Sequence, residues 1–118
     1  MSGGRRSRRL VVDETATYVW SVRHRHSVTG SCAEVLTLAR DGTRTRLLFR
    51  SGEGRFVPDG FLHSGCVAVR DASLNLHEPC VVRAFVDEGA RRGLLDRSAD
   101  LDGWELFQAV AAARAVDG

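Results

Sequence analysis

The sequence predicts an α+β domain of two layers, in which an antiparallel sheet of four or five strands is followed by two C-terminal helices packed on one face. Three observations support this fold class. Apolar and polar residues alternate with a period of two in the front half. Residues 79–93 carry an apolar stripe with helical spacing. Strand patterns come first and helix patterns last, as in other α+β domains.

Length and composition allow one domain with one core. The chain has 118 residues and 43% hydrophobic content, enough to bury roughly two-thirds of its unfolded surface. We expect residues 1–8 to form a disordered basic tail and residues 9–118 to form the single domain. All 17 basic side chains are arginine, as expected of a GC-rich genome, so their number partly reflects codon usage.

The charge is unevenly distributed along the chain, and the number of cysteines indicates a compartment. Residues 1–50 hold ten arginines against four acids, a charge of +6, whereas residues 51–118 hold seven against eleven, a charge of −4. Three cysteines, an odd number, without a secretion signal predict free thiols in a reducing cytoplasm. No apolar stretch approaches the ~20 residues that span a bilayer.

The strands follow one another through the front half. Alternation predicts them at residues 9–12, 18–26, 32–40, 43–50 and 66–69. Asp41-Gly42 is the strongest turn signal, because a type I′ hairpin needs positive φ at both central positions. We expect loops at residues 27–31 and 51–60, and a turn at residues 71–73.

The fourth strand predicts a sheet with two different faces. Thr45, Leu47 and Phe49 point one way, and the arginines of that strand point the other. In the second strand, Trp20 and its alternate neighbours are apolar, and the two histidines that follow continue the Trp20 side. The sheet should therefore have one apolar face and one arginine-lined face.

Two helices are predicted to cover the apolar face. Pro79 suits the first position of a helix, and Gly93 suits its left-handed end. After a polar connection at residues 96–103, a second helix is expected at about residues 101–115, although Gly103 and the residues after it could begin as a short strand. The predicted core comprises Leu10, Val12, Trp20, Val22, Leu47, Phe49, Val82, Phe85, Val86, Trp104 and Phe107.

The strand around Trp20 with its basic flank, and the helix pattern Pro79-x-x-Val82-x-x-x-Val86-x-x-Gly89-x-x-x-Gly93, resemble a loose group of small bacterial proteins. Members of that group have a β-rich front half and a helical C-terminal end. The resemblance covers about residues 9–110 and implies the same order of elements. It implies no activity and no site residues.

Two His-x-x-Cys pairs suggest a metal site. His63 with Cys66 and His77 with Cys80 offer two nitrogens and two thiolates, the ligand set of a tetrahedral zinc ion. The alternative is that both thiols are ordinary packed cysteines, which free cysteines commonly are. The only cofactor that the sequence suggests is thus zinc.

His24 and His26 lie two residues apart on one strand face. Such a pair could hold a metal or accept a proton near neutral pH. The alternative is a strand end that emerges into solvent, and it is favoured because no carboxylate is near in sequence to orient either ring.

The arginine-lined face suggests nucleic-acid binding. It would be formed by Arg23, Arg25, Arg44, Arg46 and Arg50, with the basic tail as a mobile arm. The aromatic residues of a single-strand platform are missing from this face. The alternative is a solubilising surface.

No pattern in the sequence indicates catalysis. There is no Gly-x-Ser-x-Gly elbow, and Gly52-x-Gly54 is not followed by the residues of a phosphate loop. We therefore predict a non-enzymatic binding or accessory protein that acts through protein–protein contact, including self-association into a dimer, at an open sheet edge. Nucleic-acid binding is the alternative, and a zinc-stabilised domain is the third hypothesis.

Overall fold

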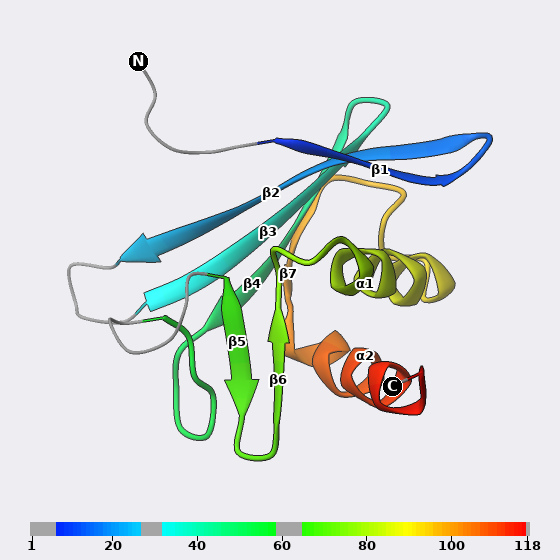
Figure 1. Ribbon diagram of the computed structural model, residues 1–118. Helices are drawn as coiled ribbons and strands as arrows, with labels where there is room; N and C mark the ends of the chain where they lie inside the picture. Colours follow the sequence, from blue (N-terminus) through cyan, green and yellow to red (C-terminus); the bar gives the residue numbers. More distant parts are fainter. Residues whose placement is uncertain (1–6, 27–31, 59–64, 118) are drawn as a thin grey trace.

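The fold class predicted from the sequence is confirmed: the protein combines a five-stranded sheet with two C-terminal helices (Figure 1). The computed structural model describes residues 7–26, 32–58 and 65–117, so the predicted tail at 1–6 and the predicted loop at 27–31 lie outside the described residues. Arg8, assigned to the tail, already belongs to the first strand.

The main sheet has the strand order β1-β2-β3-β4-β7. Its strands are β1 (Arg8–Asp13), β2 (Ala16–His26), β3 (Cys32–Arg40), β4 (Thr43–Arg50) and β7 (Ala99–Asp102). The first four pair antiparallel as neighbours in sequence. The turn between β3 and β4 has positive φ at Asp41 and Gly42, 53° and 83°, as the type I′ signal predicted.

The expectation of an entirely antiparallel sheet was wrong, because β7 runs parallel to β4. The sequence predicted a polar connection at residues 96–103. The chain returns from the first helix along the free edge of β4, where Arg46 and Asp100 face each other in register. A short polar segment thereby becomes a strand through its pairing rather than through its own apolar pattern.

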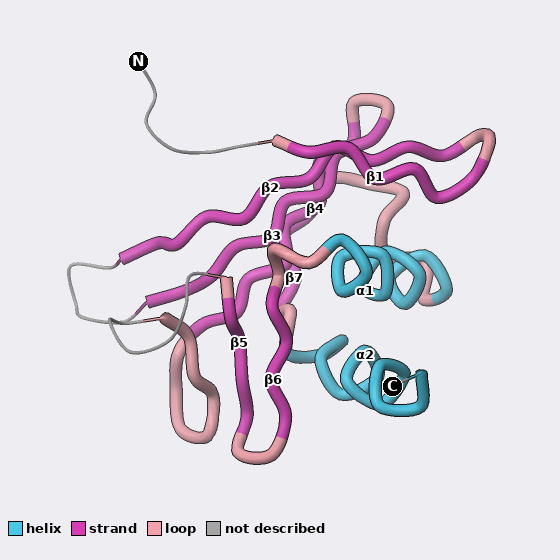
Figure 2. The backbone as a smooth tube through the Cα atoms, viewed as in Figure 1, coloured by secondary structure: helices cyan, strands magenta, loops and turns pink. Residues whose placement is uncertain are grey.

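The segment Cys66–Val69 is a strand, β5, but it does not join the main sheet. It pairs antiparallel with β6 (Ala72–Asn75) in a separate two-stranded sheet. Figure 2 shows this hairpin in front of the main sheet and beside the helices. The expected turn at 71–73 is shorter, because Ala72 and Ser73 belong to β6. It reverses the chain within the hairpin.

The helices are α1 (Pro79–Arg91) and α2 (Trp104–Asp117), which pack against each other. Pro79 occupies the first turn of α1, and Gly93 follows its end with a φ of 71°. The ring centroids of Phe49 on β4 and Phe85 on α1 are 5.5 Å apart, and those of Phe49 and Trp104 are 5.3 Å apart. Both helices therefore cover the same apolar face of the sheet.

The predicted core residues are confirmed, except that Val12 and Val22 pack against the core while staying partly exposed. Gly103 is buried and leads into α2, and the Phe49 ring occupies the space that a Cβ at this position would need. Among the described residues, no helix has both the length and the apolar character needed to cross a membrane.

Candidate metal centre and basic sheet face

The open end of the β2–β3 pair brings four polar side chains together on the face that carries Trp20. His26 is paired with Cys32, and the next pair on that face joins His24 to Glu34. Residues directly opposite on antiparallel strands share a face, with their Cβ atoms about 4.5–5.5 Å apart. The pairing register thus places two imidazoles on β2 next to a thiol and a carboxyl on β3.

Three of these residues can hold a metal ion. The ligand atoms of His24, His26 and Cys32 all lie within 4.8 Å of one another. Cys32 Sγ is 3.2 Å from His26 Nδ1, and the two imidazole centroids are 4.4 Å apart. In the part of the chain that the structure describes, this is the one group of three such ligands.

Glu34 orients one of the imidazoles. Its Oε1 is 2.5 Å from His24 Nδ1, and its Oε2 accepts a hydrogen bond of 2.9 Å from the backbone N–H of Gly65. The Glu34 side chain is fully buried, so both carboxyl oxygens need these partners. Because Nδ1 of His24 is engaged, Nε2 is the nitrogen left for a metal.

The sequence argument against a metal at His24 and His26 was that no carboxylate is near in sequence to orient either ring, and Glu34 does so from the neighbouring strand, ten positions away. His26 itself is exposed at the end of β2, as the alternative expected. The length of the loop between the two strands could have predicted the contact between Glu34 and His24. If residues 24–26 and 32–34 belong to adjacent strands joined by a five-residue loop, then 26 pairs with 32, and 24 with 34.

The described members of the two predicted His-x-x-Cys pairs come from three segments, and His77 lies close to the start of β5, where Cys66 is. Cys66 begins β5, the ring of His77 packs against Gly65, and Cys80 is exposed in the first turn of α1. Burial, with the nearby carboxyls of Glu34 and Glu78, raises the pKa of the Cys66 thiol. His63 lies outside the described residues, so the four-ligand site stays a prediction.

The arginine-lined face is formed as the alternation predicted, on the side of the sheet away from the helices. Pairing places Arg25 and Arg50 on either side of Ala33, and Arg46 beside Thr37. Arg9 on β1 joins them, because it is paired with Val19. On β7, Asp100 accepts two hydrogen bonds of 2.7 Å from Arg46, and these bonds lower the pKa of Asp100.

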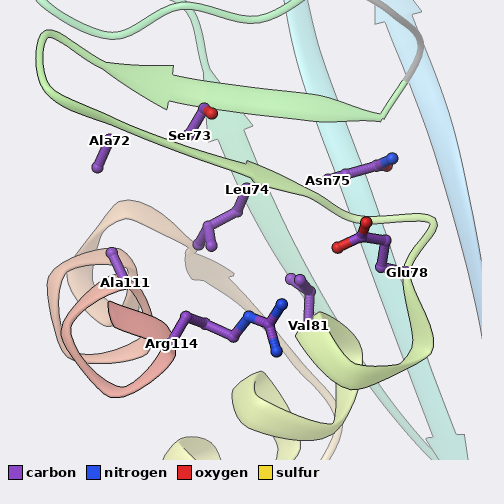
Figure 3. A pocket seen from close by; sticks show the side chains of 8 residues that line it. All are labelled: Ala72, Ser73, Leu74, Asn75, Glu78, Val81, Ala111 and Arg114. Atoms are coloured by element: carbon purple, nitrogen blue, oxygen red, sulfur yellow. The ribbon is translucent and has the colours of Figure 1, made fainter. Parts of the chain in front are cut away.

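A pocket of about 310 Å³ lies elsewhere, between β6 and the two helices (Figure 3). It is lined by Ala72, Ser73, Leu74, Asn75, Glu78, Val81, Ala111 and Arg114. The guanidinium of Arg114 extends toward Val81, and Glu78 stands at the far side. Its lining contains no histidine or cysteine, so this pocket is separate from the metal-ligand group.

Comparison of this chain with known protein families, with curated proteins and with solved structures finds no match.

Proposed function

We propose that this protein is a non-enzymatic accessory domain that binds one zinc ion through His24, His26 and Cys32. The observation that carries the proposal is the pair formed by His24 and the buried Glu34 beside the other two ligands. A histidine that binds metal almost always donates its other ring N–H to a carboxylate or carbonyl, which fixes the ring and raises its basicity. Glu34 supplies this support.

The ligand set favours zinc among the common metals. Two imidazole nitrogens and one thiolate suit a borderline-soft divalent ion, whereas calcium and magnesium require oxygen ligands. A tetrahedral zinc site places its ligand atoms about 3.3–3.8 Å apart. The 3.2 Å between Cys32 Sγ and His26 Nδ1 is close to this spacing. A water molecule would complete the tetrahedron.

The location of the site explains what the ion would do. His24 and His26 end β2, and Cys32 begins β3, so the ion would join two strands at the open end of their pairing. Metal that binds only the folded chain stabilises it. All three cysteines are free thiols, and the reducing cytoplasm predicted from the sequence would keep Cys32 available as a ligand.

Metal titration of chelator-treated protein tests the proposal. We expect one zinc per chain, and with cobalt(II) a thiolate-to-metal charge-transfer band. Cys32→Ser should remove this band, and Cys80→Ser should retain it, because Cys80 is exposed on α1 and lies outside the ligand group. Less than about 0.1 zinc per chain, or equal loss of the band in both variants, would refute the proposal.

A protein partner at the edge of the sheet is a second candidate. In the described chain, β1 pairs only with β2, which leaves the other side of its backbone open to an added strand. Val11 on β1 is 65% exposed, the highest value among the large hydrophobic residues described. Light scattering should show association that rises with concentration and is lost in Val11→Lys. A monomer at every concentration would exclude self-association.

A further inference from the structure

The outer face of the main sheet, which is the face away from the helices, carries most of its arginines. It carries Arg9, Arg23, Arg25, Arg44, Arg46 and Arg50 from three strands, against Asp100 and Asp102 from β7. Six arginines against two aspartates give this face a charge of +4. The helices, with their aromatic contacts to Phe49, lie on the other face.

Five of these arginines form no ion pair among the described residues, namely Arg9 on β1 and four on β2 and β4. Arg46 is engaged by Asp100, and the other ion pairs in the described chain involve arginines outside this face. The four on β2 and β4 are Arg23, Arg25, Arg44 and Arg50. Arg23 and Arg25 are two residues apart on one strand, about 7 Å, and Arg25 and Arg50 are two strand spacings apart, about 10 Å. Arg25 therefore lies within about one Debye length of both Arg23 and Arg50 at 0.1 M salt, whereas Arg44 lies six residues from Arg50 along β4, about 20 Å away.

Between Arg25 and the arginines of β4 the outer face offers little apolar surface, whereas toward β1 it exposes Val11 at 65% and Val19 at 42%. Ala33, Val35 and Leu48 lie on this face, but they are only 6%, 3% and 2% exposed. Arginine stems cover apolar surface in this way while their guanidinium groups stay in water. The core of a protein–protein interface is apolar and depleted in charge, so the centre of this face resembles a phosphate-binding surface more closely.

The aromatic residues exclude one kind of nucleic-acid platform. Tyr18, Trp20 and Phe49 are buried on the opposite face, and the described residues of the outer face include no aromatic side chain on which an unpaired base could stack. A ligand at this face would be held through its phosphates. A duplex presents closely spaced phosphates without exposing its bases to stacking.

We infer that the outer sheet face binds duplex nucleic acid through its phosphates, independently of sequence, with Arg23, Arg25, Arg44 and Arg50 as the contacts. This inference concerns a different face from the zinc site and does not depend on that site. Four phosphate contacts predict that the logarithm of the association constant falls with the logarithm of salt concentration with a slope of about −3.6.

Fluorescence anisotropy with a labelled 20-base-pair DNA duplex tests the inference. The zinc concentration is held constant, and salt is varied from about 50 to 200 mM. Arg25→Ala with Arg50→Ala should weaken duplex binding about tenfold or more and reduce the slope by about 1.8. The control is Arg83→Ala with Arg91→Ala, which removes the same charge from exposed sites on α1. This control pair should change the slope by less than half of the change caused by Arg25→Ala with Arg50→Ala.

Four outcomes would overturn the inference. The first three are no duplex binding at about 50 mM salt, equal weakening by both pairs of substitutions, and tighter binding of polyglutamate than of the duplex. The third would assign the face to an acidic protein partner instead. A single strand of the same sequence should bind more weakly than the duplex, and tighter binding of the single strand would also contradict the inference. Thermal unfolding of each variant identifies any loss of binding that follows from misfolding.

Discussion

The carboxyl group of Glu34 and the imidazole of His24 meet across β3 and β2, with Glu34 Oε1 2.5 Å from His24 Nδ1. Glu34 is fully buried, whereas 23% of the His24 side chain is exposed. The carboxyl group therefore holds the ring from the core side, and an ion can reach the ring from solvent. A metal site requires this arrangement, in which a buried group orients a ligand that solvent can reach.

The first prediction concerns that support. Glu34→Gln keeps the size of the side chain but removes the carboxylate, so zinc affinity should fall about 10- to 100-fold, as when other hydrogen-bond partners of metal-binding histidines are replaced. Competition with a chromophoric chelator measures the change. Glu53→Gln, in the exposed loop after β4, is the control and should leave the affinity unchanged. Equal affinity of Glu34→Gln and the unsubstituted protein would show that Glu34 does not support the site.

The second prediction concerns the close approach of β7 to β4. A Cβ added at Gly103 would lie 2.4 Å from Cζ of Phe49, whose ring is fully buried against Phe85 and Trp104. Gly103→Ala should therefore lower the free energy of unfolding by about 1–3 kcal/mol, measured in urea. Gly52→Ala meets no atom within 4 Å and should stay within about 0.5 kcal/mol of the parent. Equal stabilities would show that the Phe49 ring can move aside.

Local signals account for the parts of the fold that the sequence predicted. The bounds of β3 and β4 follow from alternation on either side of the Asp41-Gly42 turn. Those of α1 follow from Pro79 at its start and Gly93 after its end. Each of these signals acts within a few residues, so no knowledge of distant contacts was needed.

The missed features depend on contacts between distant residues. The strand β7 has only four residues, two of them aspartates, and Asp100 reaches Arg46 across 54 positions of sequence. Glu34 reaches His24 across ten positions, through a pairing register that the residue pattern alone did not establish. The metal-ligand group was therefore missed although each of its members was visible in the sequence.

The third prediction concerns the pH dependence of the link between β4 and β7. Hydrogen bonds from Arg46 hold the pKa of Asp100 below its ordinary value of 3.8. A carboxyl whose pKa is lowered by folding contributes stability above its unfolded pKa, and this contribution is lost as pH falls through the folded value. Both side chains are partly exposed, so the contribution should be less than about 1 kcal/mol.

Asp100→Asn isolates this contribution. At neutral pH the variant should be less stable than the parent, and the difference should shrink as pH falls below about 3.8. Urea unfolding at a series of pH values measures both free energies. Asp71→Asn, in the exposed turn of the β5–β6 hairpin, is a control for the loss of an acidic group. A difference that is constant with pH would contradict the assigned role of the ion pair.

The fourth prediction concerns the thiols. Iodoacetamide attacks thiolates, so Cys80, which is exposed on α1, should react faster than Cys66, whose pKa is raised by burial and by the carboxyls of Glu34 and Glu78. If zinc binds at the open end of β2 and β3, it should protect Cys32 and leave the rate at Cys80 unchanged. Mass spectrometry of peptides from a time course, with and without zinc, gives all three rates. Protection of Cys80 together with Cys66 would instead place the metal at the site formed by the two His-x-x-Cys pairs. Equal rates at Cys32 with and without zinc would remove that thiol from the ligand set.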